Sequence, residues 1–256
     1  MVLAVAAGRG DAKAHDRTLE LFRRRGPNGR WRGAFRMRTI AIVARKGGAG
    51  KTTLAFHLAV AAHLRGLKTV LADADPQRSA SEVLKIRTAP GPTRAETSGP
   101  KLFALKDTAF RSGHELMVID TPCGPEQEVG AAMGIADLVL VVVRPTFLDI
   151  AAAVRTIDTA RRLARPALII INQAYSTRSG LEPPSVTKAL EALRFTSLPV
   201  SPAIVRSRAL LQSALASGRS AEEFGDSAAG HEIAALWRHV SDALADKADK
   251  ARRLRA

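Results

Sequence analysis

Residues 39–53 read TIAIVARKGGAGKTT, and this stretch decides the fold class. It begins with an apolar run, Thr39 to Ala44, which predicts a strand, and an amphipathic helical pattern follows from Lys51 to Arg65. A glycine-rich turn lies between the two. Glycines let successive backbone N–H groups face a phosphate, and the helix adds the positive end of its dipole. The stretch therefore predicts a phosphate-binding loop.

The residue types in this loop suit the parts of a bound nucleotide. Lys51 supplies a cation for the phosphates, and Thr52 supplies a hydroxyl for Mg²⁺. The predicted nucleotide-binding residues of the loop are Gly47, Gly48, Ala49, Gly50, Lys51, Thr52 and Thr53.

Outward from the loop, short apolar runs alternate with helical patterns, which is typical of a parallel sheet with helices on both faces. The predicted strands are Thr39–Ala44, Thr69–Ala72, Leu102–Leu105, Leu116–Ile119, Leu138–Val143, Ala167–Ile171 and a weaker Leu198–Ile204. The predicted helices are Lys51–Arg65, Arg78–Arg87, Gln127–Ala136, Asp149–Leu163, Pro184–Leu193, Arg208–Ser217 and Ala228–Ala248. The proline-rich stretch Thr88–Lys101 is predicted to be an exposed loop.

The bulk composition bounds the organisation of the chain. With 256 residues and 46% apolar content, one core is expected. Residues 1–36 carry nine basic and three acidic side chains, a net +6 of the total +15. We expect a basic, flexible extension at 1–36, either a polyanion-binding arm or an upstream addition before Met37, and one domain built around the phosphate-binding loop at 37–256. The single Cys123 favours a reducing, cytoplasmic compartment.

Three further segments complete a family resemblance. The run from Lys46 to Thr53, Lys-Gly-Gly-Ala-Gly-Lys-Thr-Thr, carries an extra lysine before the glycines, the second strand is followed by Asp73-Ala-Asp75-Pro-Gln, and Leu116–Pro122 is a buried strand ending in Asp120-Thr-Pro. Together they resemble the ParA/MinD group of deviant Walker A ATPases, in its small form without an N-terminal helix-turn-helix domain. The resemblance implies a P-loop NTPase fold and, as cofactors, ATP and Mg²⁺.

The resemblance also implies roles for individual residues. Lys46 would reach the nucleotide of a second copy, Asp75 would orient the attacking water, and Asn172 would contact the adenine edge. Mg²⁺ would be held by Thr52, Asp73 and Asp120. The catalytic candidates are thus Lys46, Lys51 and Asp75. Plainer interpretations stay open, since Lys46 can be a solvated loop lysine, Asp75 a helix cap and Asn172 a turn residue.

The high positive charge indicates a polyanionic partner, either nucleic acid or an anionic membrane. In the family, basic residues near the C-terminus bind double-stranded DNA without sequence preference, which implies Arg206, Arg208 and Arg219 as DNA-binding residues. A solvated basic helix face remains the alternative. A MinD-like membrane role is the rival function, although the tail after Val240 offers few bulky apolar residues.

The function that this resemblance implies is that of a ParA-like ATPase. It would form an ATP-dependent homodimer, bind DNA on the nucleoid and position plasmid, chromosome or protein cargo. Its hydrolysis would be stimulated by a ParB-like or other cargo adaptor. A metabolic ligase sharing the phosphate loop is a third class, for which the sequence offers no substrate motif.

Overall fold

One parallel sheet forms the centre of the protein. The computed structural model describes residues 37–177 and 179–253, with side chains described up to residue 245, so the predicted extension at 1–36 lies outside the described residues. The strands in this part of the chain are β1 (Arg38–Val43), β2 (Thr69–Asp73), β3 (Thr93–Glu96), β4 (Leu116–Asp120), β5 (Leu138–Val143) and β6 (Ala167–Ile171). They are ordered β3-β2-β4-β1-β5-β6, and each strand is parallel to its neighbours in the sheet.

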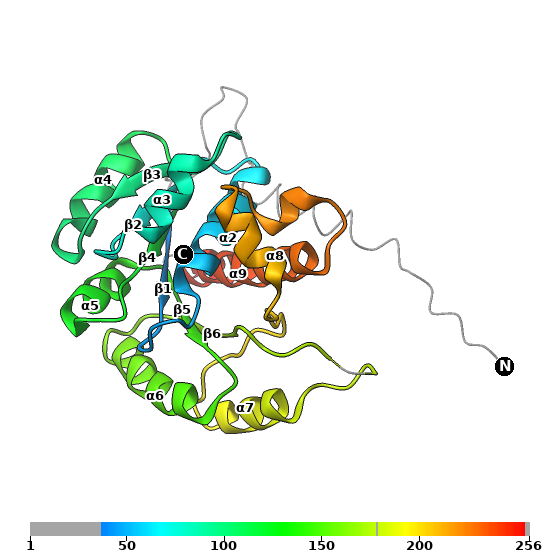
Figure 1. Cartoon of the computed structure of the whole chain (residues 1–256). Coiled ribbons are helices and arrows are strands. Elements are labelled where there is room, and N and C mark those ends of the chain that lie inside the picture. The colour runs from blue at the N-terminus through cyan, green and yellow to red at the C-terminus, as the bar shows by residue number, and fades with distance from the viewer. Residues whose placement is uncertain (1–36, 178, 254–256) are drawn as a thin grey trace.

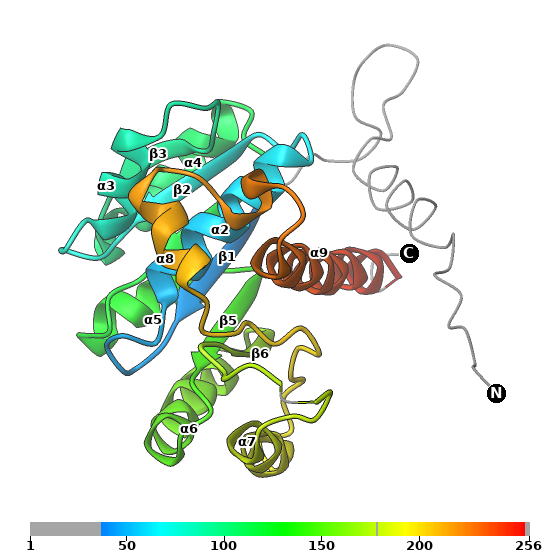
Figure 2. The same cartoon turned by 45° about the vertical axis from the view of Figure 1, so that its right-hand side comes forward.

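Helices cover both faces of the sheet (Figures 1 and 2). On one face lie α2 (Lys51–Leu64), α3 (Ser79–Ile86), α8 (Ala209–Ala216), the short helix η2 (Ala221–Phe224) and α9 (Ala228–Arg253). On the other lie α4 (Leu102–Arg111), α5 (Glu126–Ile135), α6 (Phe147–Arg162) and α7 (Pro184–Arg194). The doubly wound α/β fold predicted from the alternation of apolar runs and helical patterns is confirmed.

The strands read as continuous apolar runs because both of their faces are buried. In β1, Ile40 and Ile42 pack in the core beneath α2, whereas Ala41 and Val43 pack in the opposite core. The same alternation in β5 sends Leu140 to the first core and Val141 to the second. The parallel arrangement brings the carboxyl ends of the strands to one edge, where the predicted site residues follow β1, β2, β4 and β6.

Three predicted elements were wrong. Leu102–Leu105 begins the helix α4, which buries Leu102 and Ala109, seven residues apart, rather than alternate residues. The predicted loop Thr88–Lys101 contains β3 and the short helix η1 (Gly99–Lys101). Leu198–Ile204 makes only an isolated bridge, between Val200 and Ile169, and is no strand.

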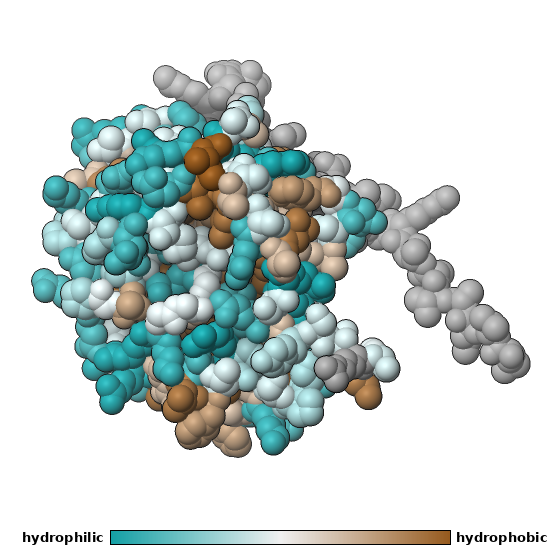
Figure 3. All heavy atoms as spheres, viewed as in Figure 1, coloured by the Kyte–Doolittle hydropathy of each residue, from teal (hydrophilic) through white to brown (hydrophobic). Residues whose placement is uncertain are grey.

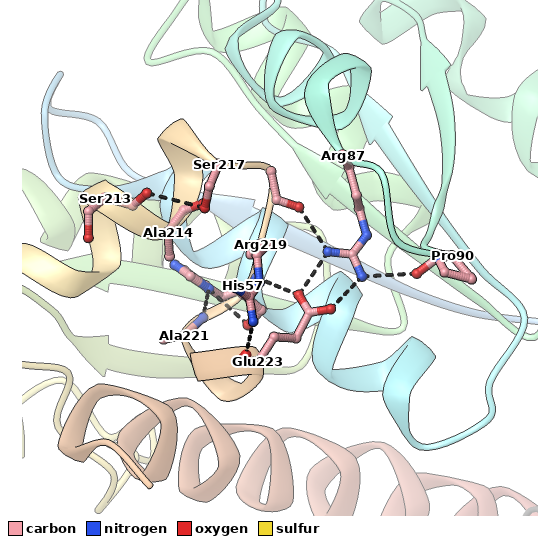
Figure 4. A network of polar contacts seen from close by, with 11 residues as sticks. His57, Arg87, Pro90, Ser213, Ala214, Ser217, Arg219, Ala221 and Glu223 are labelled. Atoms are coloured by element: carbon pink, nitrogen blue, oxygen red, sulfur yellow. Dashed lines mark hydrogen bonds and ion pairs between the residues drawn. The ribbon is translucent and has the colours of Figure 1, made fainter. Parts of the chain in front are cut away.

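A buried polar network attaches the α8–η2 segment to α2 (Figure 4). Nδ1 of His57 lies 3.0 Å from the Ser220 hydroxyl and accepts a hydrogen bond from the Ala221 N–H at 3.2 Å, and its Nε2 lies 3.4 Å from the Leu211 carbonyl oxygen. Next to it, Glu223 accepts two hydrogen bonds of 2.8 Å from Arg87. These contacts join three segments that are far apart in the sequence.

The surface is largely hydrophilic on the face shown in Figure 3, and one of its apolar areas lies low in the view, where Figure 1 places α6 and α7. Large exposed apolar side chains on these two helices and at their ends include Phe147, Leu148 and Phe195. Among the described residues, none of the helices is both long and apolar enough to cross a membrane.

Candidate nucleotide-binding site

The loop between β1 and α2 has the backbone that a phosphate cradle requires. Gly48 and Gly50 adopt φ values of 72° and 90°, a region that side chains with a Cβ rarely occupy. At Gly50 there is also no room for a side chain, because a Cβ would lie 2.3 Å from Nδ2 of Asn172. Gly50 is the N-cap residue of α2, so the free N–H groups of the first helical turn point into the loop.

The two lysines of the loop occupy different environments. Lys51 is the first residue of α2 and only 7% exposed, which suits a cation held against the phosphates of the chain's own nucleotide. Lys46 lies at the other end of the loop, partly exposed, beside the exposed Gly47 and Gly48. One loop therefore presents an inner cation and an outer one.

The strand ends bring two predicted carboxylates side by side. Asp73 and Asp120 are the last residues of β2 and β4 and are register partners. Burial is the main cause that raises the pKa of Asp120 to about 7, while the Thr52 hydroxyl and the Lys51 ammonium oppose the rise and the charges of Asp73 and Asp75 add to it. By hydrogen-bond geometry neither Asp120 oxygen has a donor among the described residues, although the Thr52 hydroxyl lies near enough to hold the pKa of Asp120 down.

This buried, unsatisfied carboxylate fits a cation. Leaving a buried carboxylate without a partner is costly, and Mg²⁺ characteristically uses one or two carboxylates together with a hydroxyl and nucleotide phosphates. Asp120 would hold Mg²⁺ with Thr52, through the metal's water shell or directly. Groups of three or more His, Cys, Asp or Glu side chains suited to a metal are absent from the described residues, so the metal depends on the nucleotide for its other ligands.

The carboxylates of Asp73 and Asp75 accept hydrogen bonds from backbone N–H groups. Oδ1 of Asp73 accepts from the Asp75 N–H at 3.2 Å, and its Oδ2 accepts from the Ser81 N–H at 2.8 Å. Asp75 accepts from the Gln77 N–H at 2.9 Å, which stabilises a turn. The N-cap residue of α3 is Arg78, so Asp75 is not its cap. Asp75 is half-buried beside Asp73, and its role with water stays a prediction.

Asn172 holds the loop itself. It follows β6, is 2% exposed, and its Nδ2 donates to the Ala49 carbonyl at 2.8 Å. The next residue, Gln173, donates to the Gly48 carbonyl, also at 2.8 Å. The predicted adenine contact of Asn172 stays a prediction, whereas its contact with the loop and that of Gln173 were missed, because residues 49 and 172 are too distant in sequence for any local pattern.

Two further contacts tie the loop region to the segment after β4. The Thr121 hydroxyl donates to the Ile42 carbonyl at 2.7 Å, and the Arg45 guanidinium pairs with Glu126 at the start of α5. The Arg45 hydrogen bond is the main cause that lowers the pKa of Glu126. These two contacts join the phosphate-loop region to the segment that begins at Asp120.

The three arginines predicted to bind DNA each have an intramolecular partner. Arg206 is 9% exposed and forms an ion pair with Glu182 at 2.5 Å, and Arg208 pairs with Glu232 at 2.6 Å. Arg219 lies 4.1 Å from the ring centroid of Phe224 and donates to a backbone carbonyl. Arg206 is buried and Arg208 is part-buried, whereas Arg219 is exposed, and their contact with DNA stays a prediction.

The sheet is parallel, a glycine-rich loop follows β1, and the next helix begins with a buried lysine. The aspartate at the end of β4 is placed to hold a metal ion. This arrangement defines a P-loop nucleotide-binding protein. Residues 40–221 match the family of the CobQ/CobB/MinD/ParA nucleotide binding domain, and the chain belongs to this family. ATP with Mg²⁺ is the ligand of the site.

Relatives in sequence include two proteins named maintenance of carboxysome distribution protein A. The one from Gloeobacter kilaueensis is 30% identical over 215 residues, covering 81% of this chain and 94% of the relative. The one from Halothiobacillus neapolitanus is 28% identical over 201 residues, covering 73% and 88%.

Solved structures support the fold. A variant of McdA from Cyanothece in complex with ATP has a TM-score of 0.68 at 18% identity, covering 83% of this chain and 97% of that one. The cell division ATPase MinD of Pyrococcus furiosus has a TM-score of 0.67 at 20% identity, covering 81% and 99%. At these identities the likeness shows the fold alone.

Proposed function

We propose that this chain is an ATPase that pairs with a second copy when ATP is bound and uses hydrolysis to position a cellular cargo. The observation that carries the proposal is the contrast between the two lysines of one loop. Lys51 is buried at the start of α2, whereas Lys46 stands at the exposed end of the loop. An outer lysine of this kind can reach phosphates held by another copy, and a single copy needs only the inner one.

Hydrolysis is supported by the groups around the site. Asp120 with Thr52 can hold Mg²⁺, which neutralises the charge that develops on the phosphates. Asp75 follows β2 at the same sheet edge and is half-buried, so it can orient a water molecule toward the terminal phosphate. Asp75 would act by positioning the water rather than as a strong base, so we expect ATP turnover to be slow without a stimulating partner.

The test separates nucleotide binding from pairing. Lys51→Ala should abolish binding of a fluorescent ATP analogue, whereas Lys46→Ala should bind it normally but remain monomeric in sedimentation with a nonhydrolysable analogue. Asp75→Ala should pair and fail to release phosphate. Lys188→Ala, an exposed lysine on α7, is the matched control and should behave as wild type. A Lys46→Ala dimer as stable as that of wild type would refute the role of Lys46 between copies.

Positioning of cargo is the function that the relatives suggest. Two relatives are named for the maintenance of carboxysome distribution, and this chain covers most of their length. We infer a protein assembly, plasmid or chromosomal locus as cargo, and an adaptor protein that stimulates hydrolysis. Cells lacking the gene should show clustered or unevenly inherited cargo.

Nonspecific DNA binding is the proposed anchor, which would place the protein on the nucleoid in the cytoplasm. It is supported by the net charge of +15, of which +9 belongs to residues 37–256 after the +6 of residues 1–36 is subtracted. Pairing two copies should roughly double the phosphate contacts, and the logarithm of the affinity falls by about 0.9 per contact for each unit of log salt.

A salt series of gel shifts, with and without ATP, tests this anchor on the full chain and on a chain starting at Met37. ATP-dependent binding by both chains supports it. Binding that ignores ATP and disappears with residues 1–36 would contradict it. Arg219→Ala is the informative variant, because Arg206 and Arg208 form ion pairs within the protein.

A further inference from the structure

The turn between β2 and α3 contains a strained residue. Arg78, the N-cap residue of α3, has a φ of 55° and a ψ of 25°, in the left-handed region that side chains with a Cβ rarely adopt. Glycine fits this conformation without a steric cost, yet an arginine stands here. Backbone strain of this kind persists where the surrounding structure holds it, and it is concentrated at active sites and ligand clamps.

Strain and a hydrogen bond to the site occur together at two residues. Among the described residues, those other than glycine with a positive φ are Arg78, Ala164, Gln173, Ser179 and Ser197. Gln173 donates from its side chain to the Gly48 carbonyl oxygen of the phosphate loop. Arg78 donates from its side chain to the carbonyl oxygen of Asp73, at the end of β2. Two strained residues thus each support the backbone of a loop at the nucleotide site.

Arg78 closes the turn from Asp73 to Arg78 in two ways. Its N–H donates to the Asp75 carbonyl oxygen at 3.0 Å, and Nη1 of its side chain donates to the Asp73 carbonyl oxygen at 2.5 Å. Between these two attachments the Asp75 carboxylate accepts from the Gln77 N–H at 2.9 Å. One residue therefore holds both the backbone that carries Asp75 and the strand end from which that backbone leaves.

The turn is also attached to the elements around it. The Arg78 carbonyl oxygen accepts a hydrogen bond from the Glu82 N–H at 2.9 Å, at the start of α3. Oδ2 of Asp73 accepts from the Ser81 N–H at 2.8 Å, and the Asp73 carbonyl oxygen accepts from the Thr97 N–H at 2.9 Å, just after β3. The clamp formed by Arg78 is therefore fixed to β2, to the end of β3 and to α3.

A purely local role in starting α3 does not account for the arginine. A cation is unfavourable beside a helix N-terminus, because the helix dipole already places positive charge there. The left-handed backbone is likewise unfavourable for arginine and favourable for glycine. What the arginine contributes at this position is its contact with the Asp73 carbonyl oxygen. That contact lies at the sheet edge where Asp73 and Asp120 are register partners, which is the edge of the nucleotide site.

The geometry points to Arg78 as a positioning residue for ATP hydrolysis that acts through Asp75. By clamping the turn to the end of β2, Arg78 holds the Asp75 carboxylate in the direction that orients the attacking water. This role rests on the proposed function, because it assumes that Asp75 orients that water. A shift of about 1 Å in a positioned group can cost roughly 100-fold in rate, so a loosened turn should be visible in turnover.

The test replaces Arg78 by glycine, which removes the clamp and the backbone strain together. In the full chain with ATP and Mg²⁺, Arg78→Gly should lower kcat for phosphate release at least about 10-fold. The KM for ATP, the affinity for a fluorescent ATP analogue and pairing in sedimentation should stay within about 2-fold of wild type. The melting temperature without nucleotide should change little, because relief of strain offsets the lost hydrogen bond.

The matched control is Ser197→Gly. Ser197 has the same φ of 55° and is exposed, in the segment after α7 and away from the nucleotide site. This variant should resemble wild type in turnover, analogue binding and pairing. A fall in kcat shared by Ser197→Gly and Arg78→Gly would show that added backbone freedom is the cause, and the positioning role of Arg78 would be wrong.

Two more variants test whether the effect runs through Asp73 and Asp75. Arg78→Lys retains one donor for the Asp73 carbonyl oxygen, so its kcat should lie between those of wild type and Arg78→Gly. Equal rates for the lysine and glycine variants would contradict the role of that contact. In an Asp75→Ala chain, adding Arg78→Gly should not lower the residual kcat further, because residues that act as a unit are not additive. Losses that multiply would show that Arg78 acts independently of Asp75.

The outcomes separate the role of Arg78 from the function on which it rests. If wild type releases no phosphate, or if Asp75→Ala turns over as fast as wild type, the proposed role of Asp75 fails and that of Arg78 fails with it. If Asp75→Ala is inactive and Arg78→Gly keeps the wild-type kcat, only the role of Arg78 is wrong. Loss of analogue binding in Arg78→Gly would likewise overturn it and assign Arg78 to nucleotide binding.

Discussion

His57 gives the fold a dependence on pH that can be calculated. The imidazole is fully buried on α2, and burial is the main cause that lowers its pKa to about 4. The Leu211 carbonyl and the charge of Glu223 oppose this shift. The hydrogen bonds in Figure 4 agree with a neutral ring, because Nδ1 accepts from the Ala221 N–H and a proton placed there would meet another donor.

The sign follows from where the proton binds. Between pH 6.5 and 4 the unfolded chain takes up a proton on His57 that the folded protein excludes, so the free energy of unfolding falls as the pH falls through this range. Full exclusion corresponds to about 3 kcal/mol, from a shift of roughly 2.5 pH units at 1.36 kcal/mol each. Between pH 8 and 5 the expected loss attributable to His57 is about 2 kcal/mol.

Urea unfolding of the nucleotide-free protein, at half-unit steps of pH from 8 to 5, measures this loss. Carboxylates also titrate toward the lower end, so the quantity that matters is the difference between wild type and His57→Asn. The asparagine can accept from the Ala221 N–H and stays neutral at every pH. The variant should be less stable at pH 8 and lose about 2 kcal/mol less on acidification. Parallel pH profiles for the two proteins would refute the reasoning.

Three further changes probe other parts of the structure. Gly50→Ala should reduce nucleotide affinity at least about 10-fold by equilibrium titration, because its φ of 90° and the 2.3 Å approach to Asn172 leave no place for a Cβ. Asp120→Asn should remove the Mg²⁺ dependence of ADP affinity without lowering the melting temperature of the free protein, since it replaces a buried carboxylate that lacks a hydrogen bond. Arg206→Ala should cost about 1–3 kcal/mol of stability, because it breaks the ion pair with Glu182, whereas Arg194→Ala at the exposed end of α7 should cost almost nothing in the same unfolding experiment.

Local chemistry explains which elements could be predicted. The phosphate loop was predicted because its glycines, Lys51 and Thr52 are consecutive and the strand and helix around it are strongly patterned. The edge strand β3 was missed because its four residues, TRAE, include a single apolar side chain. An edge strand with mostly exposed residues needs no apolar run, so hydrophobic pattern gives no signal there.

Contacts between distant segments explain what the sequence did not reveal about the site. The pattern identified Asn172 but not its bond to Ala49, and it gave no reason to select Gln173. Arg206 and Arg208 were grouped because no acidic residue lies between them and Arg219 in the sequence. Their acidic partners, Glu182 and Glu232, stand 24 residues away in each case and meet them only in the folded protein.

The helix α2 connects the nucleotide to the segment for which a DNA contact was predicted. Its first residue, Lys51, belongs to the phosphate site, and His57 lies six residues later, about 9 Å along the helix axis. Through His57, the same helix contacts Leu211, Ser220 and Ala221, the segment that includes Arg219. Most of the α2 residues are buried in a close-packed core, so a shift of α2 on binding ATP would either displace this segment or stretch the His57 hydrogen bonds. That requirement supplies a physical route by which ATP can alter a surface far from its phosphates, whether the partner there is DNA or another protein.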